Sequence, residues 1–142
     1  MEDDSARITL RAEISPSEDA EKVLQAARNV LGECNYSVQK NEGSVVLRSS
    51  GLRCLQKVHD QLRDRHVRDA ARRILLRSVD GDTLRILFNR QAAFVGVIAT
   101  VSSAEESPLG PLVLELITRD PQGVIDWLTL YQTVEPQSQA RP

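Results

Sequence analysis

Apolar and polar positions alternate at the start of the chain and predict a strand over residues 7–14. A period of two with apolar side chains on one face indicates a strand buried on one side; here that face holds Ile8, Leu10, Ala12 and Ile14. Residues 15–18 then have the form of a capping box, with Ser15 as N-cap and Glu18 reaching back. They predict a helix to about residue 31, which Gly32 ends.

The centre of the chain predicts a hairpin followed by helices. Residues 35–40 and 44–49 are strand-like and flank a tight turn at 41–43. The spacing of apolar positions predicts helices over residues 52–63 and 67–77. Residues 74–79 have a second interpretation, because Asp-Gly at 80–81 is a strong turn signal and allows a hairpin with the following strand.

The last third predicts strands and a closing helix. Residues 83–88 and 92–101 are rich in branched side chains, and residues 112–118 form another apolar strand. Two prolines make 107–111 a stiff loop, and a helix begins at Asp120-Pro121 and runs through Leu130. Hairpins mixed with helices indicate the α+β class, as a two-layer α/β sandwich whose mostly antiparallel sheet is covered by helices on one face.

Length and composition indicate one globular domain. The chain has 142 residues, of which 41% are apolar and 27% charged, as is ordinary for a folded domain. We expect the domain to cover residues 7–131, with a flexible N-terminus over 1–6 and a disordered tail over 132–142. No apolar run approaches the roughly 18 residues of a membrane span, and the acidic start of the chain is unlike a secretory signal. We therefore expect a cytoplasmic protein with no membrane partner.

Residues that could carry catalysis or bind a metal form no recognisable pattern. His59 and His66 lie seven positions apart, about 10.5 Å along a helix, which is too far for one metal ion. Cys34 and Cys54 lack zinc-site spacing, and in a reducing compartment we expect two plain thiols and no disulfide. No glycine-rich phosphate loop is present. We therefore predict no cofactor, and nothing in the sequence argues for an enzyme.

Charge is distributed unevenly along the chain. Residues 48–77 carry nine basic and three acidic side chains, a net +6, whereas the rest carries nine basic and seventeen acidic ones, a net −8. Arginine outnumbers lysine fifteen to three, and its planar guanidinium suits two-point contacts with phosphate. Such a segment can steer an anionic partner to one face. Genomic base composition or thermal adaptation would also enrich arginine.

The helix expected over residues 67–77 is the candidate nucleic-acid surface. A helical wheel of residues 65–77 at about 100° per residue gives an apolar side of Val67, Ala70, Ala71, Ile74 and Leu75. One flank holds Arg65, Arg68 and Arg72, and the other holds Arg73 and Arg77. These five arginines are the predicted phosphate contacts. The alternative is a solvated face with intrahelical ion pairs, such as Asp64 with Arg68 and Asp69 with Arg73.

A polar triplet interrupts the apolar stretch that follows residue 83. Asn89 and Gln91 could read a ligand or a base edge, with Arg90 on a phosphate. They could equally cap a turn or border a subunit interface. Aromatic residues are only 4% of the chain, which argues against base stacking on a single strand.

Five segments agree in order with an archaeal family. They are Ile14-Ser15-Pro16-Ser17-Glu18-Asp19-Ala20-Glu21-Lys22-Val23, Asp69-Ala70-Ala71-Arg72, Asn89-Arg90-Gln91-Ala92-Ala93-Phe94-Val95-Gly96, Ser107-Pro108-Leu109-Gly110-Pro111 and Ile125-Asp126-Trp127-Leu128. Over residues 7–130 the chain resembles uncharacterised protein family 0201, which is grouped with predicted RNA-binding proteins. The resemblance implies a fold like that of large-ribosomal-subunit protein five and a homodimer. The family usually has lysine where Arg90 stands, which preserves the charge but not the geometry.

Together these features predict a non-catalytic protein that binds structured RNA through phosphates. A homodimeric interaction or regulatory module without a nucleic-acid role is the alternative, and an enzyme acting on a small anion ranks third. We expect the homodimer to form through the sheet near residues 84–97, because helices can cover only one sheet face.

Overall fold

The computed structural model describes residues 5–32, 34–63 and 65–129. The tail expected over residues 132–142 lies outside them, as does most of the N-terminal segment expected to be flexible. Within the described ranges, no helix is both long enough and apolar enough to cross a membrane.

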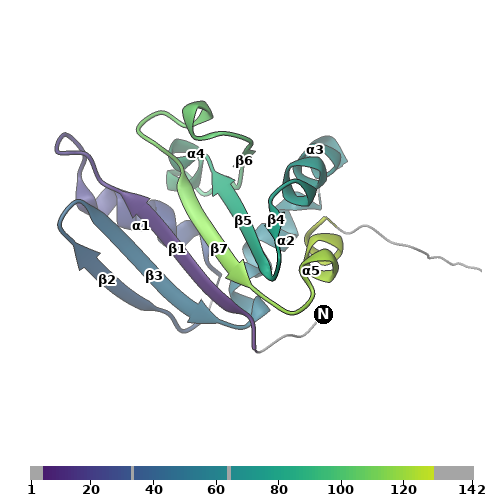
Figure 1. Ribbon diagram of the computed structural model, residues 1–142. Coiled ribbons are helices and arrows are strands. Elements are labelled where there is room, and N and C mark those ends of the chain that lie inside the picture. Colours follow the sequence, from purple (N-terminus) through teal and green to yellow (C-terminus); the bar gives the residue numbers. More distant parts are fainter. Residues whose placement is uncertain (1–4, 33, 64, 130–142) are drawn as a thin grey trace, which may run out of the picture.

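Seven strands in the described part of the chain form one antiparallel sheet (Figure 1). Its order is β2-β3-β1-β7-β5-β4, and β6 also pairs with β5. The strands are β1 (Arg7–Glu13), β2 (Ser37–Asn41), β3 (Ser44–Ser50), β4 (Val79–Asp80), β5 (Thr83–Phe88), β6 (Thr100–Val101) and β7 (Leu112–Ile117).

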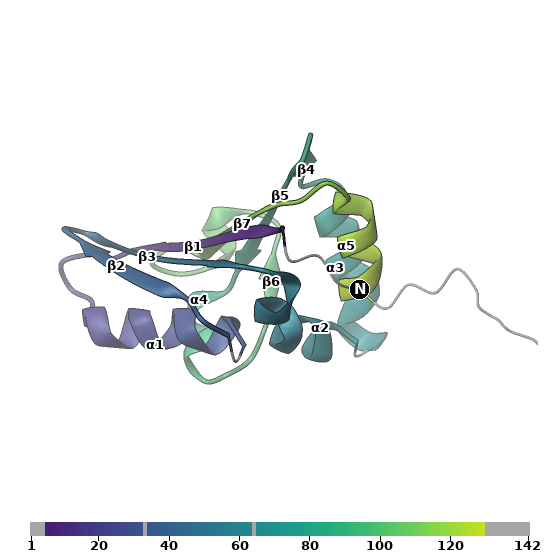
Figure 2. The same cartoon turned by 90° about the horizontal axis from the view of Figure 1, so that it is seen from below.

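Helices α1 and α2 lie along one side of this sheet, and α3 and α5 pack together near β4 (Figure 2). The helical elements are α1 (Ala20–Val30), η1 (Leu52–Leu55), α2 (Gln56–Leu62), α3 (Arg65–Leu76), α4 (Arg90–Phe94), η2 (Ala104–Glu106) and α5 (Pro121–Leu128). This arrangement confirms the predicted α+β sandwich with a mostly antiparallel sheet.

The alternation in β1 decides which side of the sheet meets the helices. Ile8, Leu10 and Ala12 are at most 2% exposed, whereas Arg7 and Arg11 face water. The same register carries apolar side chains across β5 and β7, and α1, α2 and α5 cover them with their own buried residues. Each fully buried leucine or isoleucine contributes about 1.5–3 kcal/mol relative to an exposed one, so burial of this layer is a large favourable contribution to folding.

The first helix begins later than predicted. α1 starts at Ala20, with Asp19 as N-cap accepting the backbone N–H of Glu21 at 3.0 Å. Residues 15–18 form a separate turn. In it, the Ser15 N–H donates to Glu18 Oε1 at 2.9 Å, and the Glu18 N–H donates to the Ser15 carbonyl at 3.0 Å. Glu18 therefore reaches back as expected, but it precedes the helix instead of belonging to its first turn.

Both interpretations of residues 74–79 hold in part. Helix α3 runs to Leu76, and β4 then pairs with the start of β5 in a short hairpin. The turn passes through Gly81 with φ at +62°, a left-handed conformation that glycine adopts without steric cost.

The strand predicted over residues 92–101 is wrong. Residues 90–94 form α4, and within that span only Thr100–Val101 pair with β5. Asn89 starts α4, because its side-chain oxygen accepts the Ala92 N–H at 2.9 Å. A local N-cap followed by alanines outweighs the branched residues further on.

The prediction of two plain thiols is also wrong. Cys34 and Cys54 form a disulfide, with their Cα atoms 5.4 Å apart. The Gly32 N–H donates to the Cys54 carbonyl at 2.8 Å, so the backbone already holds the two segments together. The prediction assumed a reducing compartment, where disulfides are rare. Intracellular proteins of hyperthermophilic archaea are an exception and are rich in disulfides.

Candidate nucleic-acid interface

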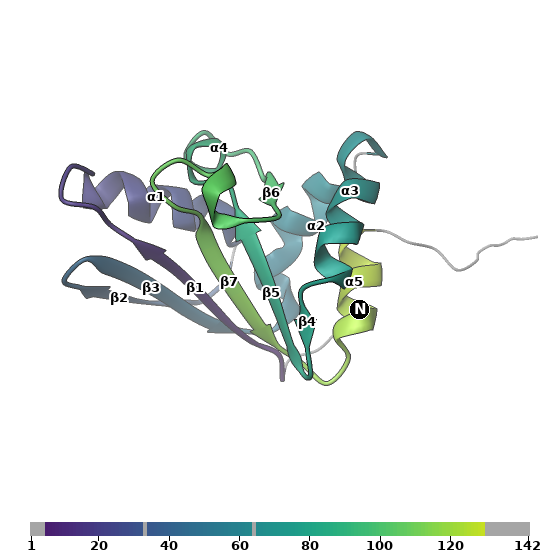
Figure 3. The same ribbon diagram turned by 45° about the horizontal axis from the view of Figure 1, so that its top comes forward.

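Helix α3 carries the predicted arginines, but its buried face is rotated from the expected one. Ala71 and Leu75 are at most 1% exposed, whereas Val67 is 42% exposed. On the helical wheel the buried direction is turned by about 50° toward Arg68 and Arg72. Those two arginines consequently flank the packed side of the helix, which Figure 3 shows beside α5.

Arg72 is engaged in the packing of α3 against α5. Its Nη1 lies 2.8 Å from Asp126 Oδ1 and donates to Thr129 Oγ1 at 3.2 Å. Only 17% of the Arg72 side chain is exposed. A phosphate would have to displace Asp126 to reach this guanidinium, so Arg72 stabilises the helix pair.

Arg73, on the opposite side of α3, and Arg77, in the turn directly after Leu76, are called the outward pair below. Both are exposed, and neither forms a salt bridge with a described residue. Arg68 is half-buried, with its Nε 3.8 Å from Asp69 Oδ1. Arg65 begins the helix, but its side chain lies outside the described part, as does the Asp64 partner considered above. Of the five arginines predicted to contact phosphate, the outward pair is therefore the one that the described part of the structure leaves open to a partner.

Asn89 and Gln91 take different places at the start of α4, one as its N-cap and the other in its first turn. Asn89 caps the helix, and its own N–H donates to the Ala99 carbonyl at 2.8 Å. The capping role considered from the sequence is therefore present. Gln91 is exposed on the first turn of α4.

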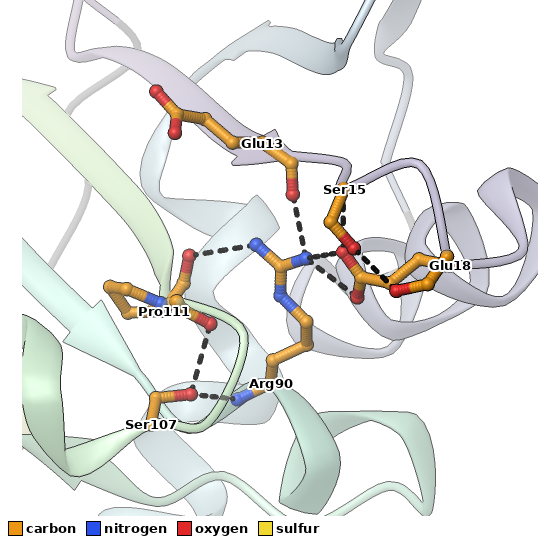
Figure 4. Close-up of polar contacts among 8 residues, drawn as sticks. Glu13, Ser15, Glu18, Arg90, Ser107 and Pro111 are labelled. Carbon is orange, nitrogen blue, oxygen red and sulfur yellow. Dashed lines mark hydrogen bonds and ion pairs between the residues drawn. The ribbon is translucent and has the colours of Figure 1, made fainter.

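Arg90 lies buried where four segments meet (Figure 4). Its Nη1 donates to the Glu13 carbonyl at 2.6 Å and to both carboxylate oxygens of Glu18 at 2.9 Å. Its Nη2 donates to the Pro111 carbonyl at 3.3 Å, and its backbone N–H donates to Ser107 Oγ at 3.0 Å. Only 4% of Arg90 is exposed. The guanidinium therefore holds the end of β1, the turn before α1, α4 and the loop before β7 together.

The contact with Arg90 affects the pKa of the Glu18 carboxyl. Burial raises its pKa, but the Ser15 backbone N–H and the hydrogen bond and charge of Arg90 together outweigh burial. The pKa of Glu18 consequently lies below its ordinary value of 4.5. Glu18 remains a carboxylate at neutral pH and completes a buried ion pair.

Two further basic surfaces were missed by sequence reasoning. One is the sheet face away from the helices, where the register brings Arg7, Arg11, Arg48 and Arg85 together around one acidic residue, Glu115. The other is a pocket lined by Arg28, Arg53 and Lys57. Strand alternation predicted that some of these residues are exposed, and the basic segment 48–77 contained others, but neither pattern grouped them. Their grouping depends on strand order and helix packing, which local patterns do not contain.

Comparison with known proteins places this arrangement in a family. A family model described as RNA binding matches residues 7–116. A UPF0201 protein of Sulfurisphaera tokodaii is 42% identical over 125 residues, covering 87% of this chain and 86% of that protein. A UPF0201 protein of Metallosphaera sedula is 42% identical over 123 residues, covering 86% of each. The chain belongs to the UPF0201 family.

Solved structures show that the UPF0201 fold is shared at lower identity. The crystal structure of an uncharacterised UPF0201 protein superposes with a TM-score of 0.73 at 23% identity, covering 92% of this chain and 98% of that one. The UPF0201 protein of Methanococcus jannaschii superposes with a TM-score of 0.69 at 19% identity, covering 89% and 94%. The resemblance inferred from the five sequence segments is thereby confirmed.

Proposed function

We propose that this UPF0201 protein binds structured RNA by contacting phosphates through the outward face of α3. The observation that carries the proposal is the outward pair, two exposed arginines at the end of α3 and in the turn after it, neither with a described salt-bridge partner. Arg68, which is half-buried on the other flank of α3, is the third proposed contact. The RNA-binding description of the family model supports this class of partner. Arg72 and Arg90 are assigned to the fold, because each is held by a carboxylate.

The low aromatic content favours structured RNA over extended single strands. Aromatic residues are 4% of the chain, whereas proteins that bind single strands stack bases on successive aromatic side chains. Phosphate contacts carry no sequence information, so we expect recognition by shape. A catalytic role is not part of the proposal.

The salt dependence of RNA binding tests the proposal. Three arginines from each of two subunits give about six contacts, so log affinity should fall against log salt with a slope of about −4 to −5. Arg73→Ala with Arg77→Ala should remove about four of the six contacts and reduce the slope to roughly −1 to −2. Gel shifts of a short RNA hairpin over a salt series measure both slopes.

A matched control separates the site from net charge. Lys22→Ala with Arg119→Ala removes the same number of exposed charges from α1 and from the segment before α5, and it should leave the slope close to that of the parent. If the control pair weakens binding as much as the outward pair, α3 is not the RNA surface. A parent protein that binds no RNA at low salt would remove the proposal altogether.

We also propose that the protein is a homodimer, and an exposed apolar patch favours this. Phe94, Val95, Val97 and Leu109 are between 41% and 72% exposed, and three of them lie within the interface expected over residues 84–97. Exposed apolar clusters mark interaction sites. This patch, and not a sheet edge, is the surface we assign to the dimer, because β5 is flanked by β7 on one side and by β4 and β6 on the other.

Light scattering tests the dimer. The parent protein should have twice the monomer mass at micromolar concentration, and Val95→Asp should have the monomer mass, because a buried unpaired carboxylate disfavours association. Ala70→Asp, on the exposed side of α3, should leave the mass unchanged. A monomeric parent protein would contradict the prediction. A dimer that lacks RNA affinity would instead support the alternative function, a protein-interaction module.

A further inference from the structure

A second basic surface is concave and lies in the helical layer. It is formed where the end of α1, the segment before β2 and the start of η1–α2 meet, and it encloses about 830 Å³. Figure 2 shows α1 and α2 following one another along the same side of the sheet. Pockets that hold small ligands typically enclose about 300–1,000 Å³, so this one has the size for a nucleotide.

Three cationic side chains line this pocket. Arg28 comes from the last turn of α1, Arg53 from η1 and Lys57 from α2. None of the three forms a salt bridge with a described residue, and no carboxylate is among the described residues that line the pocket. Glu33 is outside the described part and is not counted. Like charges repel one another, and an anion bound between them relieves that repulsion.

The pocket is held in shape by covalent and backbone contacts. The Cys34–Cys54 disulfide joins the segment before β2 to η1, and the Gly32 N–H donates to the Cys54 carbonyl at 2.8 Å. A Cβ at position 32 would lie 3.4 Å from the Arg53 carbonyl and 3.8 Å from the Lys57 nitrogen. These are ordinary van der Waals distances, so position 32 lies directly against η1 and the start of α2. A site preformed in this way loses less entropy on binding.

The remaining lining groups suit the rest of a nucleotide. Gln25 and Gln56 use their Nε2 atoms within the protein, donating to Asn29 Oδ1 at 2.9 Å and to Asp60 Oδ1 at 2.8 Å. Their Oε1 atoms accept no hydrogen bond from a described residue and can accept from a base or a ribose hydroxyl. Tyr36 is half-buried beside them and offers an aromatic ring for stacking.

We propose that this pocket binds a nucleotide, with Arg28, Arg53 and Lys57 on its phosphate and Tyr36 against its base. The nucleotide is either a free mononucleotide or the phosphorylated end of an RNA strand. The pocket does not include the outward pair of α3, so the inference stands whether or not that helix carries RNA.

Calorimetric titration of the full chain tests the site. AMP should bind, and adenosine should bind about tenfold or more weakly, because it lacks the charge-assisted hydrogen bonds to phosphate. Arg53→Ala with Lys57→Ala should weaken AMP by a similar or larger factor. Both side chains lie at the surface, Arg53 exposed and Lys57 half-buried, so thermal melting of this variant should match the parent. Lys22→Ala with Arg119→Ala, two exposed charges outside the pocket, is the matched control and should bind AMP as the parent does.

Two further arms identify the source of the nucleotide and the role of Tyr36. An RNA octamer with a 5′-phosphate that competes with AMP, when the 5′-hydroxyl octamer does not, assigns the site to RNA ends, and failure of both octamers assigns it to free nucleotides. Tyr36→Leu should weaken AMP but not inorganic phosphate, and equal AMP affinity would refute the stacking role. The proposal is overturned if AMP and the phosphorylated octamer both fail to bind, or if they bind equally well to the Arg53→Ala, Lys57→Ala variant.

Discussion

Replacing Arg90 with methionine should lower the free energy of unfolding by about 3–5 kcal/mol, since the change leaves a buried carboxylate without its partner. Glu18 is 9% exposed in this pair, and the carbonyls of Glu13 and Pro111 would lose a donor as well. Arg90→Lys should lower the free energy of unfolding by less than Arg90→Met, because an ammonium keeps the charge. It should still destabilise the protein, because it cannot make the several contacts of the planar guanidinium. Urea denaturation of the three proteins measures the difference.

The same pair gives the prediction a pH signature. The pKa of Glu18 is lowered in the folded protein, so its contribution to stability is fully present above the ordinary pKa that it has in the unfolded chain. It is lost as pH falls through the folded pKa. The stability gap between the parent and Arg90→Met should therefore narrow below about pH 4 and stay constant near neutrality. Arg85→Met, at an exposed position on β5, is the control and should change stability little. A gap independent of pH would show that lost packing, and not the ion pair, explains the effect.

Breaking the disulfide should have the second largest effect. Cys34 and Cys54 are separated by 20 residues, and a crosslink closing a loop of that length stabilises a protein by about 3 kcal/mol. Cys34→Ala should therefore lower the melting temperature by roughly 10 °C. Cys34 is the better position for the change, because Cys54 is fully buried and its replacement would also create a cavity.

Reductant provides the control for this prediction. It should lower the melting temperature of the parent protein by a similar amount and leave the Cys34→Ala variant unchanged. Mass spectrometry after alkylation should detect two modified cysteines only when the parent has first been reduced and unfolded. Two thiols that react readily in the untreated protein would contradict the disulfide.

Local patterns in the sequence were sufficient for much of the fold. The alternation over residues 7–14 predicts β1 to within one residue, and the strand predicted over 83–88 matches β5. Such segments have one buried face, so side-chain period alone reports the backbone conformation. The strand predicted over 92–101 was wrong because the hydrogen bond from the Ala92 N–H to the Asn89 side chain starts a helix there. This one contact outweighs the average strand preference of the residues that follow.

The candidate sites depended much more on tertiary structure. Composition by itself located the basic segment 48–77, and five ordered motifs indicated the family. Neither could assign the arginines to roles, because their partners lie far away in the chain: Arg90 meets Glu18 across 72 positions, and Arg72 meets Thr129 across 57. The same holds for the disulfide and for the pocket built from α1 and η1–α2. Side-chain period and charge are properties of neighbouring residues, whereas an ion pair or a pocket exists only once distant segments have packed together.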